Sequence, residues 1–288
     1  MVYLLAIGSA ILYGAADFTG GLTTRRAGTI QVVLLSQFSG LALVVLLLSL
    51  LPSAAVHQSD VVWGGIAGLV GGVGVALLYR ALSIGVMAVV APTTAVCAVT
   101  IPVVYSVFRG ERPAPLAVLG IILGVASIVL VSQQRTLTDT GHGLVAEPGR
   151  LPLGVGTALL SGIAIGFFFL ALAQTSPTAG MWPLVASRSV SVLMFGLVAA
   201  VRRTSFRIPG QVLALVIVAG TVDMLANALY LIAAQRGPLS IVVTLSSLYP
   251  ASTVLLARVV LRERLNVLQM TGVGCALAAV LLIVSGGT

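Results

Sequence analysis

The chain has 288 residues, of which 59% are hydrophobic and only 8% are charged, and its mean hydropathy is +1.16. A soluble domain carries roughly 25% charged residues, so this chain has too few charges to cover the surface of a soluble globule. The net charge of +8 comes from arginines alone, because the sequence contains no lysine. These arginines stand singly or in small groups at the ends of apolar runs, which is typical of membrane topology signals and argues against nucleic-acid binding.

Ten apolar runs follow one another along the chain, and each is close to the roughly 20 residues that cross a lipid bilayer. The first run has no basic segment before it and no clear cleavage site, so it is expected to be a retained span. Turn-forming or charged residues separate the runs. The predicted spans are 2–22, 30–51, 61–82, 86–108, 114–132, 152–173, 179–200, 210–234, 238–260 and 266–286.

The two halves of the chain repeat one another. A polar connecting loop, 133–151, separates a first five-helix unit, 1–132, from a second, 152–288. The pattern Gly110-Glu111-Arg112 with Gly120 recurs 152 positions later as Arg262-Glu263-Arg264 with Gly272. Five spans is an odd number, so the second unit enters the bilayer from the opposite face. The predicted fold is therefore an all-α membrane protein of ten transmembrane helices in two inverted five-helix repeats.

These motifs carry a family resemblance over essentially the whole chain. They comprise Leu12-Tyr13-Gly14, Tyr79-Arg80-Ala81-Leu82 with Gly85, and the two Glu-Arg repeats, the second of which follows Pro250. With these features the chain resembles the EamA-type members of the drug/metabolite transporter superfamily. It departs from their pattern at Tyr13, where a tryptophan is usual, and at Pro102, which is displaced by one turn. The resemblance implies a small-molecule carrier with a central cavity lined by both halves.

Inverted repeats can exchange conformations and so open a midplane site alternately to either side. The predicted function is secondary transport of a small metabolite or drug-like molecule by alternating access. One version of this prediction is export that is coupled to protons. The expected location is the cell (plasma) membrane as a multi-pass protein, the inner membrane of a cell that has two. The expected partners are a small-molecule substrate and the lipid bilayer, with a homodimer left open. No cofactor is expected, because no nucleotide-binding motif is present.

Polar side chains within the spans are the candidate functional residues, because an ionisable group in the bilayer centre is costly unless it is paired or lines a cavity. Asp17, Arg188 and Asp223 are the charges in this position. Several spans also carry polar residues at helical spacing, and these stripes are expected to converge on one cavity. The candidate substrate-binding residues are Tyr13, Asp17, Thr93, Cys97, Arg188, Asp223, Asn227, Tyr230, Thr244 and Ser247.

Structural explanations compete with each of these roles. Asp223 and Arg188 could form a purely structural pair between consecutive helices, and Asp17 could pair with Arg25 or Arg26 near the interface. Serine and threonine stripes often only donate to the carbonyl one turn back. Related small multidrug transporters, however, carry an essential carboxylate on their first helix, which favours a functional role for Asp17.

An enzyme is not expected. Both histidines, His57 and His142, lie in connections, so no buried histidine-based triad can form, and Cys97 and Cys275 lack the spacing of a metal site. A non-transporting membrane sensor or assembly subunit remains the alternative function. A carrier requires converging polar stripes in both halves, whereas such a subunit does not.

Four further expectations concern packing and orientation. The series Gly64, Gly68, Gly72 and Gly74 predicts close helix contacts. Glu111 and Glu263 are expected to be interfacial anchors or helix-end charges, and the second, fifth and tenth spans, which have few polar residues, are expected to be outer helices. Eleven arginines follow odd-numbered spans and three follow even-numbered ones. The positive-inside rule then places both termini outside the cytoplasm, whereas the family resemblance implies that both are cytoplasmic.

Overall fold

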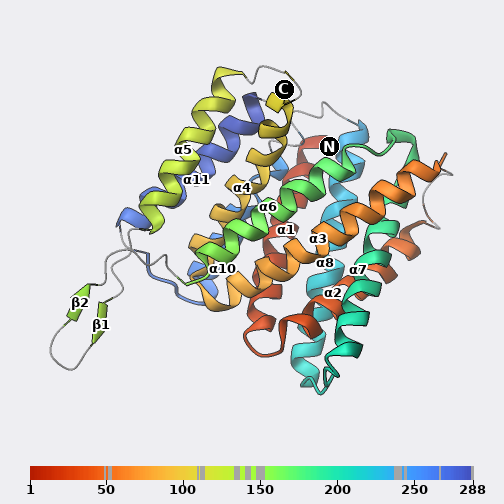
Figure 1. Cartoon of the computed structure of the whole chain (residues 1–288), viewed down its shortest axis with the longest axis horizontal. Helices are drawn as coiled ribbons and strands as arrows, with labels where there is room; N and C mark the ends of the chain where they lie inside the picture. Colours follow the sequence, from red (N-terminus) through yellow and green to blue (C-terminus); the bar gives the residue numbers. More distant parts are fainter. Residues whose placement is uncertain are drawn as a thin grey trace.

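The computed structural model describes residues 1–48, 50, 54–108, 110, 114–132, 137–139, 144–146, 153–236, 242, 245–265 and 267–286. These residues form ten α-helices, a short 3-10 turn (η1, Pro177–Ala179) and a small hairpin (Figure 1). The first five helices are α1 (Val2–Thr24), α2 (Thr29–Leu48), α3 (Gln58–Ile84), α4 (Met87–Phe108) and α5 (Pro115–Ser132). The others are α6 (Val155–Leu172), α7 (Trp182–Val201), α8 (Gly210–Arg236), α10 (Tyr249–Val260) and α11 (Val267–Gly286).

Nine of the ten predicted spans agree with these helices to within a few residues at each end. Seven helices are long and apolar enough to cross a membrane, and α4, α5 and α10 contain shorter apolar stretches. The predicted span 238–260 is represented by α10, and much of its first half lies outside the described residues. Within the connection 133–151, strands β1 (Leu137–Asp139) and β2 (Leu144–Ala146) pair in an antiparallel hairpin.

Equivalent helices of the two repeats run antiparallel where they meet. Along α5 and α11, Gly120 lies against Ile283 and Gly124 lies against Ala279, so one helix ascends as the other descends (Figure 1). An axis parallel to the helices would make such equivalent neighbours run parallel. The repeats are therefore related by an axis that crosses the helices, which confirms the inverted arrangement.

Glycines repeat the same close contacts in both halves. A Cβ atom built on Gly68 of α3 would lie 2.2 Å from the carbonyl oxygen of Ser187 in α7. Gly220, which stands 152 positions after Gly68, meets Ser36 of α2 in the same way, at 2.0 Å. Only glycine allows helix backbones to approach so closely. The prediction that the Gly64–Gly74 series serves helix packing is confirmed.

The α1–α10 and α6–α4 contacts are also equivalent. Gly14 of α1 and Gly162 of α6 each pack against a carbonyl oxygen, a side-chain Cβ atom and an amide nitrogen of the neighbouring helix. These partners belong to Tyr249, Ser252 and Thr253 for Gly14, and to Thr94, Cys97 and Ala98 for Gly162.

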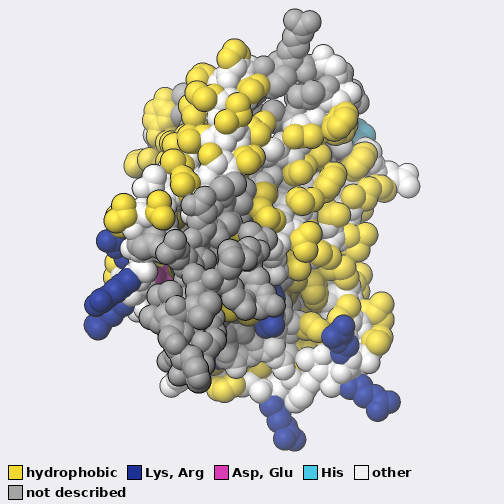
Figure 2. Space-filling model, turned by 60° about the vertical axis from the view of Figure 1, so that its left-hand side comes forward, with side chains coloured by type: hydrophobic (Ala, Val, Ile, Leu, Met, Phe, Trp, Pro, Cys, Tyr) yellow, Lys and Arg dark blue, Asp and Glu magenta, His cyan; other side chains and the backbone are white. Residues whose placement is uncertain are grey.

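The two ends of the bundle differ in charge. The arginine-rich end comprises the connections α1–α2, α3–α4, α5–α6, α7–α8 and α10–α11, and the terminal end carries both chain termini (Figure 1). Figure 2 shows hydrophobic side chains along most of the height of the molecule and arginines towards the arginine-rich end. The exposed arginines there are Arg25, Arg26, Arg80, Arg202, Arg203, Arg207, Arg258, Arg262 and Arg264.

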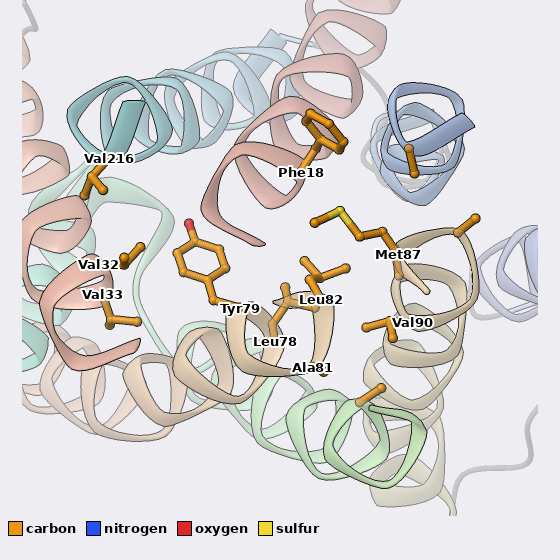
Figure 3. Packing of buried hydrophobic residues seen from close by; sticks show 14 of the residues in the cluster. Phe18, Val32, Val33, Leu78, Tyr79, Ala81, Leu82, Met87, Val90 and Val216 are labelled. Carbon is orange, nitrogen blue, oxygen red and sulfur yellow. The ribbon is translucent and has the colours of Figure 1, made fainter. Parts of the chain in front are cut away.

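The arginine-rich end is closed by small residues packed on large ones. Gly20 of α1 lies against the ring of Tyr79 in α3, and Gly21 lies against Leu82 and Met87. These large side chains belong to the main hydrophobic core, where Leu82 and Met87 point towards Phe18 of α1 (Figure 3). The equivalent helices of the second repeat, α6 and α8, have no comparable packing among the residues described.

A charged network reinforces this closure. The backbone N–H groups of Met87 and Ala88 donate to the two carboxylate oxygens of Glu263, at 3.1 and 3.0 Å. The guanidinium of Arg25 lies 3.7 Å from the same carboxylate and donates to the carbonyl of Leu82 at the end of α3. Glu263 thus satisfies the free amides at the N-terminus of α4, where the helix dipole favours a negative charge. The expected role of Glu263 as a helix-end charge is confirmed, and Glu111 lies outside the described residues.

Candidate functional site

An ion pair lies in the interior of the bundle, between α7 and α8. The guanidinium of Arg188 donates to the carboxylate of Asp223, which stands halfway along α8. About 13% of the Arg188 side chain and 20% of the Asp223 side chain remain accessible. Both charged side chains are therefore largely buried but keep some accessible surface, although they stand well inside long apolar helices.

The second arm of Arg188 reaches the first repeat. Its Nη1 atom donates to the side-chain carbonyl of Gln37, which is buried in α2. Gln37 and Arg188 directly follow Ser36 and Ser187, the two residues that occupy equivalent places against Gly220 and Gly68. The Arg188–Gln37 bond therefore joins equivalent positions of the two repeats and lies on the axis that relates them.

Asp17 of α1 is the second carboxylate of the interior. It makes no hydrogen bond or ion pair with any part of the chain that the structure describes. The alternative in which Asp17 pairs with Arg25 or Arg26 is wrong for the described structure, since Arg25 pairs with Glu263 instead. Asp17 is close enough to Asp223 for the two carboxylates to repel each other.

Tyrosines from four helices surround these charges. Tyr13 is close enough to interact electrostatically with Asp17, Arg188 and Asp223, and also with Tyr230 of α8. The rings of Tyr13 and Tyr249 meet edge to face with centroids 6.2 Å apart. Tyr249 and Tyr79 are also close enough to Asp17 to interact with it electrostatically. We call Asp17, Arg188, Asp223 and the four tyrosines the central cluster.

Among the other predicted residues, Asn227 lies beside this cluster. Asn227 is one turn from Asp223 and donates to its backbone carbonyl at 2.8 Å. Ser247 is half-buried next to Ser246, whose hydroxyl lies 2.8 Å from that of Ser9 in α1. Thr244 lies outside the described residues.

The polar residues predicted on α4, Thr93 and Cys97, have other neighbours. Thr93 is buried and donates to the carbonyl of Val89 on its own helix, at 2.8 Å. Cys97 packs against Gly162 of α6. In the part of the chain that the structure describes, neither residue forms a hydrogen bond or ion pair with the central cluster.

Sequence reasoning missed Gln37, Tyr79 and Tyr249. The second span was expected to be an outer helix, and this is wrong: α2 packs against both α7 and α8 and buries Gln37. A signal was available, because Gln37 is an amide in the middle of an otherwise apolar run. Tyr79 was used only to recognise a family motif, and Tyr249, which directly precedes Pro250, was not singled out.

Comparison with known proteins agrees with this architecture. The model of the EamA-like transporter family matches residues 1–133 and again residues 152–285. The chain belongs to the EamA-like transporter family. It is thus a multi-pass membrane protein of a transporter family, and the prediction that it is not an enzyme agrees with this membership.

Two other comparisons add less to this assignment. No curated protein matches the chain. One solved crystal structure covers 98% of this chain and 95% of its own, with a TM-score of 0.59 at 17% sequence identity. An identity this low shows a shared fold only.

Proposed function

We propose that this EamA-like protein is a secondary transporter that carries a small metabolite or drug-like molecule by alternating access. The observation that carries the proposal is the difference between equivalent helix pairs. Helices α1 and α3 are packed together at the arginine-rich end, whereas α6 and α8 lack such packing in the described structure. In an inverted repeat, exchange of these two arrangements closes the terminal end and opens the arginine-rich end.

The central cluster is the proposed substrate site. It contains residues of both repeats, and its charges keep some accessible surface within the bundle. Interior charges of this kind mark substrate or ion pathways in membrane proteins. The residues proposed from the sequence that support this site are Tyr13, Asp17, Arg188, Asp223, Asn227 and Tyr230. Cys97 fits better as a packing residue between α4 and α6, and Thr93 bonds its own helix.

Export and proton coupling belong to the same proposal. Asp17 and Asp223 are the carboxylates of the central cluster, and a carboxylate that exchanges a proton for substrate can couple the two fluxes. We expect export across the cell membrane. One chain contains both repeats and the whole cluster, so a homodimer would add contacts without completing the site.

Flux into sealed proteoliposomes tests the proposal. The purified full chain is reconstituted and offered a panel of small cationic, anionic and neutral metabolites, with and without a pH gradient. We expect saturable uptake of at least one compound, and loss of that uptake in the Asp223→Asn variant. If no compound moves in either direction while the protein is correctly inserted, the sensor or assembly-subunit alternative is favoured.

A further inference from the structure

Exposure alternates along the connection between α10 and α11. Glu263 and Leu265 lie inwards, where Glu263 caps α4 and Leu265 packs against the main hydrophobic core. Arg262 and Arg264 are exposed on the outer side of the connection. The carboxylate that holds the arginine-rich end closed is therefore flanked in the sequence by two exposed arginines.

These arginines lie where two apolar helices end. A third exposed arginine stands in the last turn of α10, and we call Arg258, Arg262 and Arg264 the α10–α11 arginines. They form no ion pair with the side chains that the structure describes. Apolar side chains are exposed on both sides of them, at Val259 and Val260 in α10 and at Val267 and Leu268 in α11. Because apolar helices cross the lipid, the α10–α11 arginines lie at the level of the phospholipid headgroups.

Arg262 has a backbone angle that favours glycine. Its φ is 55°, and Gly110, which stands 152 positions earlier, has a φ of 86°. The two repeats thus use a left-handed residue at the same place, with glycine in one and arginine in the other. An arginine is less favourable than glycine in this conformation. The second repeat therefore carries a guanidinium here at a backbone cost that glycine would avoid.

We propose that the α10–α11 arginines bind the headgroup of an anionic phospholipid, and that the bound lipid stabilises the closed arginine-rich end. A guanidinium binds phosphate through two parallel hydrogen bonds, and the exposed apolar side chains beside it meet the acyl chains. A zwitterionic headgroup would instead bring a cation close to three arginines. Since Glu263 lies between Arg262 and Arg264, a headgroup that holds both arginines keeps Glu263 against α4.

Quenching of tryptophan fluorescence by brominated phospholipids tests the lipid site. The full chain with Val267→Trp, Trp63→Phe and Trp182→Phe is reconstituted in mixed bilayers of phosphatidylglycerol and phosphatidylcholine, with one of the two lipids brominated in its acyl chains. We expect this tryptophan to contact phosphatidylglycerol in preference by about threefold or more. The natural Trp63 stands near the start of α3, at the terminal end. A chain that keeps Trp63 alone is therefore the control and should show little preference.

Arginine variants separate this site from the general charge of the end. Arg262→Gln with Arg264→Gln should remove most of the preference at the added tryptophan. Arg202→Gln with Arg207→Gln is the matched control, because it removes two exposed arginines of the α7–α8 connection at the same end. Glycerol 3-phosphate, which has the phosphate without acyl chains, should compete poorly. Thermal unfolding of each variant checks that the fold is intact.

A buried cysteine reports on closure of the end. In a chain carrying Cys97→Ser and Cys275→Ser, thiol labelling of Phe18→Cys is measured relative to Phe206→Cys, which is exposed at the same end. The ratio should fall by about twofold or more in phosphatidylglycerol compared with phosphatidylcholine, and the Arg262 and Arg264 variants together should abolish this difference.

The other possible results contradict the proposal. Equal contact with both lipids, or a preference that persists without Arg262 and Arg264, would overturn the lipid site. Displacement by glycerol 3-phosphate would show a site for a soluble anion instead. A lipid preference with the same labelling ratio in both lipids would overturn the effect on closure.

Discussion

Arg188 and Gln37 occupy equivalent positions of the two repeats and bind each other on the axis that relates them. A contact on this axis is carried onto itself when the two repeats exchange conformations, so the exchange does not require it to break. The Arg25–Glu263 contact lies away from the axis, at one end of the bundle. In the proposed alternating-access cycle, the Arg188–Gln37 contact can therefore persist, whereas the Arg25–Glu263 contact must open.

The first prediction concerns the interior ion pair. Asp223→Asn leaves Arg188 without a counter-ion, and breaking such a pair should cost about 1–3 kcal/mol at this partial exposure. Thermal unfolding in detergent should show the loss, and adding Arg188→Gln should recover much of it. Flux should be lost in Asp223→Asn and should stay lost in the double variant. Normal flux in both single variants would remove this pair from the mechanism.

The second prediction concerns the closed end. Glu263→Gln weakens both the cap on α4 and the attraction to Arg25, which should shift the protein towards opening at the arginine-rich end. The reporter is Phe18→Cys in a chain carrying Cys97→Ser and Cys275→Ser. Its labelling by a membrane-impermeant thiol reagent applied from that end should accelerate by about threefold or more.

Arg25→Gln should accelerate the same labelling, and Arg26→Gln is its control. Arg26 is the neighbouring exposed arginine and forms no ion pair with the residues that the structure describes. Equal labelling rates in the Arg25 and Arg26 variants would show that the network does not hold this end closed.

A third prediction compares two helical glycines. Gly220→Ala places a Cβ atom 2.0 Å from a backbone oxygen of α2, so helices must separate, at a cost of about 1–3 kcal/mol. Gly196→Ala is the control, because nothing lies within 4 Å of its added Cβ atom. Thermal unfolding should show clear destabilisation for the first and no loss for the second, since alanine favours a helix. Equal stabilities would contradict the close α2–α8 contact.

The fourth prediction is the orientation in the membrane. Nine exposed arginines lie at the arginine-rich end, whereas Arg236 is exposed at the terminal end. By the positive-inside rule, we expect the arginine-rich end to face the cytoplasm. A C-terminal alkaline phosphatase fusion should then be active and a green fluorescent protein fusion dark. The reverse pattern would show that the family orientation, with cytoplasmic termini, prevails here.

Hydropathy predicted most helix boundaries because membrane spans must satisfy their own backbone and hide it from lipid. Repeat spacing predicted the inversion, since an odd number of spans reverses direction. The Asp223–Arg188 pair could also be predicted, because two unpaired charges within the bilayer would be energetically costly. Each of these predictions needs only the sequence of one helix or of helices that follow one another in the chain.

The remaining features depend on which helices meet. Helical spacing places Thr93 and Cys97 one turn apart on α4, but no sequence pattern states that Cys97 packs on Gly162 of α6. The place of Gln37 beside Arg188 depends on the crossing of α2 and α7 at the axis. The capping of α4 by Glu263 joins residues 175 and 176 positions apart, a distance at which local patterns carry no information.

The close approach of α1 to α3 cannot be reproduced by the equivalent helices α6 and α8. Gly20 and Gly21 of α1 correspond to Phe168 and Phe169 of α6, since Gly14 and Gly162 hold equivalent contacts and the numbering runs in parallel. Phenylalanine cannot form the close helix contact that Gly20 and Gly21 make, because that contact requires a residue without a side chain. In the proposed cycle, the two end states therefore differ in free energy, and the protein without substrate rests in the lower one. Substrate that arrives at the face open in that state can bind at once, whereas substrate at the other face binds only after an unfavourable conformational change.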